Sequence, residues 1–395
     1  MDFLNPLFLL APLLLASVAA LAATRWIPPP STASRYPSID GLRGYMAFFV
    51  FLHHSSFWYF YVRSGRWEAP GSNLHNHLGR TSVVVFFMIT GFLFFSQLLA
   101  AREEPIDWTR LFISRFLRLT PLYLFVLALM LLVVGILTHF TLHDPLPTLL
   151  KDIAYWVSFN IFGAPNLNGL YDTRRIVAGV FWTLPYEWLF YFSLPLMALG
   201  LRRPVPATYL VLSMVAALVA LTQPFSWITL APFLGGIVAA FLVRSTRLRK
   251  LAAGRLAALG VLALACVIVA RYGSVNHFLP LALLSAAFAV IACGNTLFGL
   301  LTNSAAVTLG QISYSIYLLH GLLLFVTFKF IIGFERAATF SPVEHWLVIS
   351  GCAALLIFIS SLTFKFIEAP AMRRVPAVTA WLRSRANRRQ ASVVG

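Results

Sequence analysis

Residues 39–54 read Ile-Asp-Gly-Leu-Arg-Gly-Tyr-Met-Ala-Phe-Phe-Val-Phe-Leu-His-His, so an arginine stands at the start of an apolar run and two histidines near its middle. On an α-helix, with about 100° per residue, His54 lies within roughly 20° of whole turns from Arg43 and about 16 Å further along the axis. Arg43 and His54 therefore share a face, and His53 points about a quarter-turn away. An arginine at one membrane interface would place His54 near the bilayer centre, where ionisable groups are rare and usually functional.

The composition decides the class of protein. Of the 395 residues, 59% are apolar and only 11% are charged, and the mean hydropathy is +0.82. A soluble globule of this length would need far more polar surface, so the sequence predicts an all-α, polytopic membrane helix bundle. The net charge of +17 does not indicate nucleic acid, because the arginines form short clusters between apolar runs. The three cysteines lie inside apolar runs, which favours packing over a disulfide framework.

Eleven apolar segments are long enough to be read as membrane spans. The first, Phe3–Thr24, is interpreted as a retained helix and not as a signal peptide. The residues before it include the acidic Asp2 and contain no Lys or Arg. After it come Arg25-Trp26 and a linker with Pro28, Pro29 and Pro30. The segment 149–162 is shorter and amphipathic, and we expect it to be re-entrant or interfacial. The other ten expected spans are 42–61, 82–101, 119–140, 176–199, 207–223, 227–243, 253–270, 278–300, 311–332 and 345–366.

The basic residues predict the orientation. With the segment 25–43 in the cytoplasm, the cytoplasmic segments hold 21 Lys and Arg residues and the opposite side holds eight. The positive-inside bias then predicts an N-terminus outside and a C-terminus in the cytoplasm.

Four polar sites interrupt the apolar segments, and each has a structural alternative. Arg43 with His54 is the strongest functional candidate. Glu187 lies in an aromatic-rich span, where a buried carboxylate needs a partner. That partner could belong to a functional site or to a structural salt bridge. Arg115 and Arg118 are spaced to grip a phosphate-bearing ligand, or are ordinary topology anchors. The fourth site is a polar helical stripe that could instead hold helices together by hydrogen bonds, and it consists of Ser313, Tyr317 and His320. His75 and His77 are weak indicators of a metal, and no metal site is predicted.

In order along the chain, these motifs resemble the acyltransferase-3 family of integral-membrane O-acyltransferases, which modify bacterial polysaccharides, lipopolysaccharide, peptidoglycan and some antibiotics. The resemblance covers roughly residues 38–370. The similar stretches are residues 39–43 with His54, Phe86 to Leu93, Arg115 to Pro121, Trp182 to Glu187, Ser313 to His320 and Glu368 to Pro370. Two features depart from the family pattern. Val84 stands where many relatives have an acidic residue that would orient the histidine, which leaves Glu187 as the candidate for that role, and the segment Phe3–Thr24 adds a span to the usual ten.

The resemblance implies a division into an extra N-terminal helix with its linker (1–37), a membrane acyltransferase domain (38–370) and a basic cytoplasmic tail (371–395). It also implies a location in the bacterial inner membrane among its lipids, with no bound cofactor. The implied reaction moves an acyl group, expected to be acetyl, from cytoplasmic acyl-CoA to a hydroxyl of a cell-envelope or exported glycan.

The expected site divides into three roles. The catalytic residues would be His54, Arg43 and Glu187, and Arg115 and Arg118 would bind acyl-CoA. His54 would be the general base, with an acyl-histidine intermediate as a variant, and Arg43 would stabilise the oxyanion or hold the donor. Supporting polar residues would be Asp40, Trp182, Ser313, Tyr317 and His320. The competing interpretation is a transporter or flippase for an anionic or acyl-linked solute.

Overall fold

The computed structural model describes residues 2–27, 35–101 and 106–394, with side chains described to residue 385. In these ranges the secondary structure is helical, with no strand and one isolated bridge between Leu167 and Leu170. The prediction of an all-α bundle is confirmed. The proline linker at 28–30 lies outside the described residues.

The helices have the following bounds. They are α1 (Leu10–Ala23), α2 (Pro37–Ser64), α3 (Asn73–Ala100), α4 (Trp108–Leu137), α5 (Leu146–Val157), α6 (Leu184–Gly200), α7 (Ala207–Thr222), α8 (Trp227–Leu242), α9 (Thr246–Ala252), α10 (Arg255–Arg271), α11 (Phe278–Ala292), α12 (Ser304–Gln311), α13 (Ser313–Val326), α14 (Phe334–Ala338), α15 (Pro342–Thr363), α16 (Ala369–Arg373) and α17 (Val375–Val394). Short 3₁₀ turns lie at Pro6–Leu9, Thr173–Val177 and Val180–Thr183, and π-helical turns at Thr327–Ile332 and Phe364–Glu368.

The decisive stretch of the sequence lies on α2, whose ends follow helix rules. Pro37 occupies the first helical positions, where its missing N–H costs nothing. Asp40 lies in the first turn, next to the positive end of the helix dipole. Gly65 ends the helix with a φ of 69°, a left-handed conformation that glycine adopts without strain.

Glycines let α2 approach its neighbours closely. A side chain on Gly41 would overlap the backbone of Leu301, and one on Gly44 would overlap Gly310. A side chain on Gly79 of α3 would strike the ring of His53. Small residues at such crossings are typical of membrane helix packing. They fix α2 between α3 and α12, and so fix where its histidines lie.

Each expected span contains a helix, but several expected bounds are wrong. The segment 176–199 begins with 3₁₀ turns, and its helix, α6, starts only at Leu184. The segment 311–332 is broken at Ile312 and ends in a π-helical turn. The segment 278–300 is helical only to Ala292. Hydropathy shows how far a run of apolar residues continues along the chain. The helix itself can end earlier, at a backbone turn or a cap.

By length and composition, five helical segments of the described residues can cross a membrane, or six if a bent pair is one span. That pair, α8 and α9, bends by 109°. The helices α7 and α11 are apolar but shorter. The chain is therefore a multi-pass membrane protein, and the expected number of eleven crossings stays a prediction.

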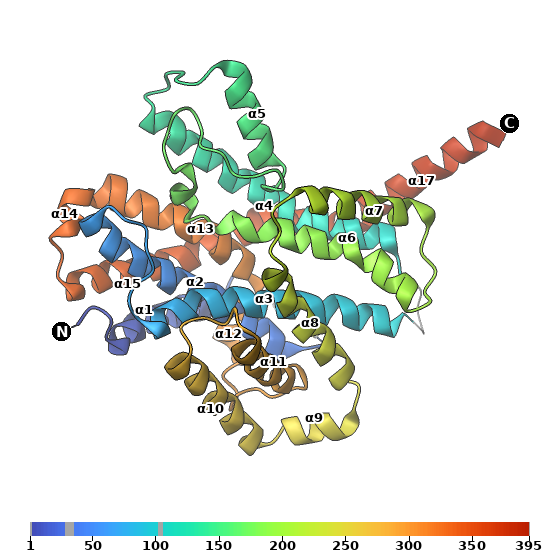
Figure 1. Cartoon of the computed structure of the whole chain (residues 1–395), viewed down its shortest axis with the longest axis horizontal. Helices are drawn as coiled ribbons and strands as arrows, with labels where there is room; N and C mark the ends of the chain where they lie inside the picture. The colour runs from blue at the N-terminus through green and yellow to red at the C-terminus, as the bar shows by residue number, and fades with distance from the viewer. Residues whose placement is uncertain (1, 28–34, 102–105, 395) are drawn as a thin grey trace.

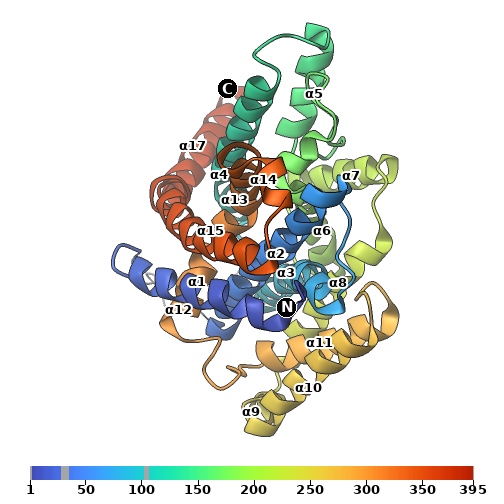
Figure 2. The same ribbon diagram turned by 90° about the vertical axis from the view of Figure 1, so that its left-hand side faces the viewer.

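Figure 1 shows the two ends of the chain at opposite ends of the molecule's longest axis. The N-terminal helix α1 lies along α15, as Figure 2 also shows, and buries the small residues Ala16, Ala20 and Ala23. Phe3, just before it, stacks on Tyr59 with ring centroids 3.7 Å apart. The helix α5 stands apart from the main bundle, and α9, α10 and α11 lie across α3 from α4 and α6.

Candidate active site

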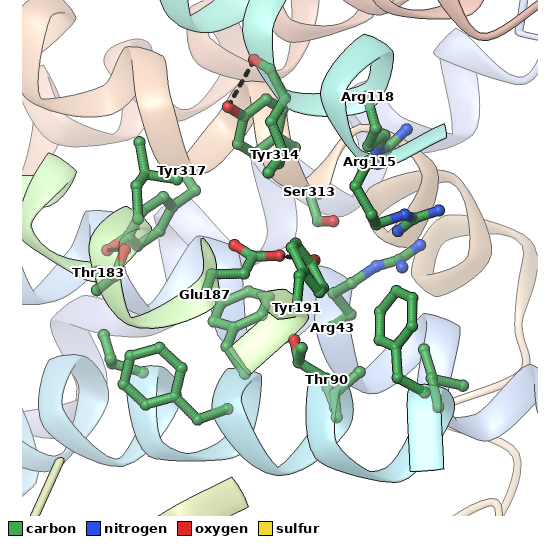
Figure 3. Close-up of a pocket in the computed structure, with 18 residues that line it drawn as sticks. Arg43, Thr90, Arg115, Arg118, Thr183, Glu187, Tyr191, Ser313, Tyr314 and Tyr317 are labelled. Carbon is green, nitrogen blue, oxygen red and sulfur yellow. Dashed lines mark hydrogen bonds between the residues drawn. The ribbon is translucent and has the colours of Figure 1, made fainter. Parts of the chain in front are cut away.

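A cavity of about 130 Å³ lies between α2, α3, α4, α6 and α13, and we call it the arginine cavity (Figure 3). Figure 3 shows the guanidinium groups of Arg43, Arg115 and Arg118 on one side of it, with Glu187 facing them. Six of the ten predicted site residues line this cavity, namely Arg43, Arg115, Arg118, Glu187, Ser313 and Tyr317.

Arg43 is held by backbone and by its own helix. Its Nε and Nη2 donate to the carbonyl oxygen of Gly310 at 3.2 and 3.0 Å. Asp40, one turn earlier, lies 3.4 Å from Nη2. Ser313 Oγ donates to the same carbonyl oxygen at 2.9 Å. Because one carbonyl receives both side chains, the guanidinium group is fixed at the wall of the cavity.

Arg118 and Arg115 differ in their partners. Arg118 forms an ion pair at 3.3 Å with Glu368, which is 1% exposed and also accepts a hydrogen bond from Ser315 at 2.5 Å. Arg115 instead lies over the ring of Phe94 at 5.0 Å and donates to Ser114 at 3.0 Å. Among the described ion pairs, Arg118 has a carboxylate partner and Arg115 has none.

Two histidines from helices far apart in the sequence meet further along α2. His54 Nδ1 lies 2.9 Å from Nε2 of His320, and the rings stack with centroids 5.0 Å apart. His320 is fully buried on α13, and its Nδ1 lies 3.1 Å from the carbonyl oxygen of Ile316. Beside them, Nδ1 of His53 lies 2.6 Å from the carbonyl oxygen of His75.

These contacts assign the protons. A carbonyl oxygen can only accept, so Nδ1 of His320 carries a proton toward Ile316 and its Nε2 is left as an acceptor. Nδ1 of His54 lies 2.9 Å from that nitrogen and 3.1 Å from the carbonyl oxygen of Val50, so it carries the proton and donates it to these two acceptors. Nε2 of His54 consequently keeps its lone pair free, which is the protonation state that a general base needs.

His54 lines a second cavity, of about 370 Å³, which we call the histidine cavity. The arginine and histidine cavities share three wall residues, Val83, Phe87 and Tyr317, so they are adjacent. The hydroxyl of Tyr317 lies 3.0 Å from that of Thr183. A few side chains therefore separate the charged groups of one cavity from the imidazole of the other.

A third cavity, of about 660 Å³, adjoins the histidine cavity at Trp182, whose side chain lines both. We call it the aromatic cavity. Large rings form part of its wall, together with polar residues and with small, aliphatic and proline residues. The rings belong to Trp67, Trp156, Phe162, Phe181, Trp182, Tyr186 and Phe225, and the polar residues are Asn160, Asp172, Arg174, Arg175 and Gln223.

The structure corrects one expected role. Glu187 does not orient His54, because it lines the arginine cavity and its Oε1 accepts a hydrogen bond from Tyr191. The orienting partner of His54 is His320, which the sequence placed only in a supporting stripe. The residues of the polar stripe therefore contact two different places. Ser313 donates to the carbonyl oxygen of Gly310, which also accepts from Arg43, and His320 contacts His54.

The structure adds several residues that the sequence analysis did not assign to the site, although most of them had a sequence signal. Tyr191 lies one helical turn beyond Glu187, so its reach to that carboxylate followed from spacing alone. Thr90 and Tyr314 lie inside quoted motifs and line the arginine cavity. Glu368 was noted only as part of a closing motif, and its pairing with Arg118 needed the tertiary structure.

Comparison of the chain with curated proteins and with solved structures gave no match. A comparison with protein families gave one: the acyltransferase domain of the acyltransferase-3 family matches residues 36–365. That match begins beside α2 and ends in the π-helical turn after α15, so it contains all three cavities. The chain is a multi-pass membrane protein that belongs to the acyltransferase-3 family.

Proposed function

We propose that this membrane acyltransferase transfers an acyl group, expected to be acetyl, from acyl-CoA to a sugar hydroxyl of an envelope or exported glycan. The observation that carries the proposal is the imidazole pair, because it leaves Nε2 of His54 free beside the arginine cavity. A metal is not needed for this step, since a neutral imidazole can remove the proton of a hydroxyl group.

The reaction begins with the acyl thioester near Tyr317, where the arginine and histidine cavities adjoin. Nε2 of His54 takes the proton of the sugar hydroxyl as its oxygen attacks the thioester carbonyl. The new C–O bond gives a tetrahedral oxyanion, for which Arg43 on the wall of the arginine cavity is the candidate cation. The C–S bond then breaks, and the imidazolium of His54 returns the proton to the thiolate of CoA.

Three features support this division of labour. The arginine cavity carries the positive charge that a phosphate-bearing donor needs. The aromatic cavity, reached past Trp182, offers flat apolar rings interrupted by amide and guanidinium groups, which suits the alternating C–H faces and hydroxyls of a sugar. His54 lies between them. In the expected topology, 21 Lys and Arg residues lie on the side of the segment 25–43 and eight on the other, which favours a donor in the cytoplasm. The family favours the bacterial inner membrane.

The test uses the purified protein in detergent with [¹⁴C]acetyl-CoA and a glycan fraction isolated from the host envelope. We expect label to appear in the glycan with release of free CoA thiol in equal amount. A transporter or flippase would instead carry labelled solute into proteoliposomes without breaking the thioester. That result, with no free thiol, would reject the proposal.

A further inference from the structure

A second group of arginines surrounds a larger cavity at the end of the bundle where α2 begins. This cavity has about 660 Å³, and we call it the cationic cavity. Its wall is built from the start of α2, the C-terminal turns of α3, α8 and α11, and α9. Three arginines line it, Arg35, Arg244 and Arg249, and no Asp or Glu is among its described lining residues.

The charges of these arginines are not used inside the described part of the protein. The ion pairs found there belong to Arg43, Arg118, Arg175 and Arg383. Arg35 lies over the ring of Tyr36 at 5.5 Å. Several cations around one hollow raise the local concentration of anions, and guanidinium groups match the oxygens of a phosphate.

A further polar residue lies at the wall of this cavity. Ser96 on α3 lines the cationic cavity and is 7% exposed. Its Oγ is enclosed by the protein, so the arginines are the charged groups that can contact a ligand in the cavity.

The cationic cavity follows the arginine cavity along two shared helices. Ile39 lines the cationic cavity and Arg43 lines the arginine cavity. The two residues are one helical turn, about 6 Å, apart on α2. On α3, Ser96 is two residues, about 3 Å, beyond Phe94 of the arginine cavity.

The sizes of the two cavities are also complementary. The arginine cavity, of about 130 Å³, is smaller than the roughly 300–1,000 Å³ usual for organic ligands. It has room for an acyl thioester, whereas the cationic cavity, of about 660 Å³, lies within that usual range.

We propose that the cationic cavity binds a phosphate ester, and that this ester is the phosphoadenosine end of the acyl-CoA donor. The assignment to acyl-CoA rests on the proposed function, whereas the phosphate site itself does not. An anionic lipid headgroup presents the same chemistry at this end of the bundle, and it is the alternative source of the phosphate.

Calorimetry of the purified protein with CoA and with 3′-dephospho-CoA separates the phosphate contribution from the rest of the donor. Wild type should bind CoA about ten-fold or more tightly than dephospho-CoA, because a charge-assisted hydrogen bond is worth about 1.5–3 kcal/mol. In Arg244→Gln and Arg249→Gln this preference should fall below about three-fold.

The matched control is Arg247→Gln. Arg247 is exposed on α9 between the two test residues but does not line the cavity. The variant removes the same charge from the same segment and should keep the full preference for CoA.

Thermal shifts with phosphatidylglycerol or phosphatidylcholine form the second arm. If phosphatidylglycerol stabilises wild type and Arg247→Gln but not Arg244→Gln, and CoA is bound without preference over dephospho-CoA, the phosphate site stands and its assignment to the donor is overturned. If neither CoA nor phosphatidylglycerol distinguishes Arg244→Gln from wild type, the whole inference is overturned.

The proposed function fails separately. Wild type that prefers CoA through Arg244 but never releases an acyl group from acetyl-CoA would keep the phosphate site and reject the acyl transfer.

Discussion

The arginine cavity and the histidine cavity share the helices α2, α3 and α13 but treat their polar groups in opposite ways. In the first, Arg43 and Arg118 are tied to oxygens of the protein itself. In the second, the chain of hydrogen bonds from His54 through His320 to a backbone carbonyl leaves one nitrogen free. A buried charge needs a partner to be tolerated, whereas a reactive group needs an atom without one.

The largest effect should come from removing the free nitrogen. His54→Ala should lower kcat for acyl transfer by about 10²–10⁴-fold, the usual contribution of a general base. The protein should still elute as one monodisperse species, because the change adds no charge to an apolar helix. Initial rates with labelled acetyl-CoA measure this loss.

His53→Ala is the neighbouring control. His53 bonds to the backbone of His75 and packs against Gly79, so its loss should be milder for kcat than that of His54. An inactive His53→Ala beside an active His54→Ala would contradict the comparison between the two cavities.

His320 acts through His54, and its replacement should have the next largest effect. His320→Ala removes one of the two acceptors of Nδ1 of His54 and leaves the carbonyl oxygen of Val50, so the ring loses the partner on α13 that orients it. We expect kcat to fall by about 10–100-fold while KM for both substrates stays nearly unchanged. His320→Gln offers a side-chain oxygen as acceptor and should recover part of the rate. Equal rates for the two variants would argue for a purely structural role.

Replacement of Arg115 should affect substrate binding, whereas replacement of Arg118 should affect stability. Arg115→Ala should raise KM for acyl-CoA about ten- to hundred-fold, since it has no carboxylate partner among the described residues and its charge remains for the donor. Arg118→Ala leaves Glu368 buried without its cation and should cost about 3–5 kcal/mol of stability.

A thermal melt measures the second effect, and Arg118→Ala combined with Glu368→Gln should recover part of the loss. If Arg118→Ala melts like wild type and only weakens acyl-CoA binding, both arginines belong to the donor site.

The orientation of the chain in the membrane can be measured by cysteine labelling, without any change in activity. Arg247→Cys, at the basic end, should react with an impermeant thiol reagent only from the cytoplasm, and Tyr171→Cys, which replaces an 84% exposed residue, only from outside. Tyr171 is a better probe than its neighbour Thr173, which is fully buried. The background should carry Cys266→Ser, because Cys266 is the exposed one of the three native cysteines. The reverse labelling pattern would place the arginine cavity on the side without acyl-CoA.

The sequence alone predicted the helical class and the facing of Arg43 and His54, because both depend on local properties. Apolar length and helical period act over a few turns, and they act even before neighbouring helices meet. The same locality explains why the ends of α6 and α11 were misjudged, since turns and caps end a helix without a change in hydropathy. The motif order also identified the family, which the match over residues 36–365 confirms.

The tertiary structure alone decided the partners. His54 and His320 are 266 residues apart, and no periodicity within either helix could assign one to the other. Their contact depends on which faces of α2 and α13 meet. The close approach of Gly44 on α2 to Gly310 on α12, just before α13 begins, helps to set this. Glu187 was accordingly assigned to the wrong neighbour, because a lone carboxylate in an apolar segment requires a partner but does not say which one. The sequence determines which side chains are present, whereas the partner of each side chain is determined only when the helices pack.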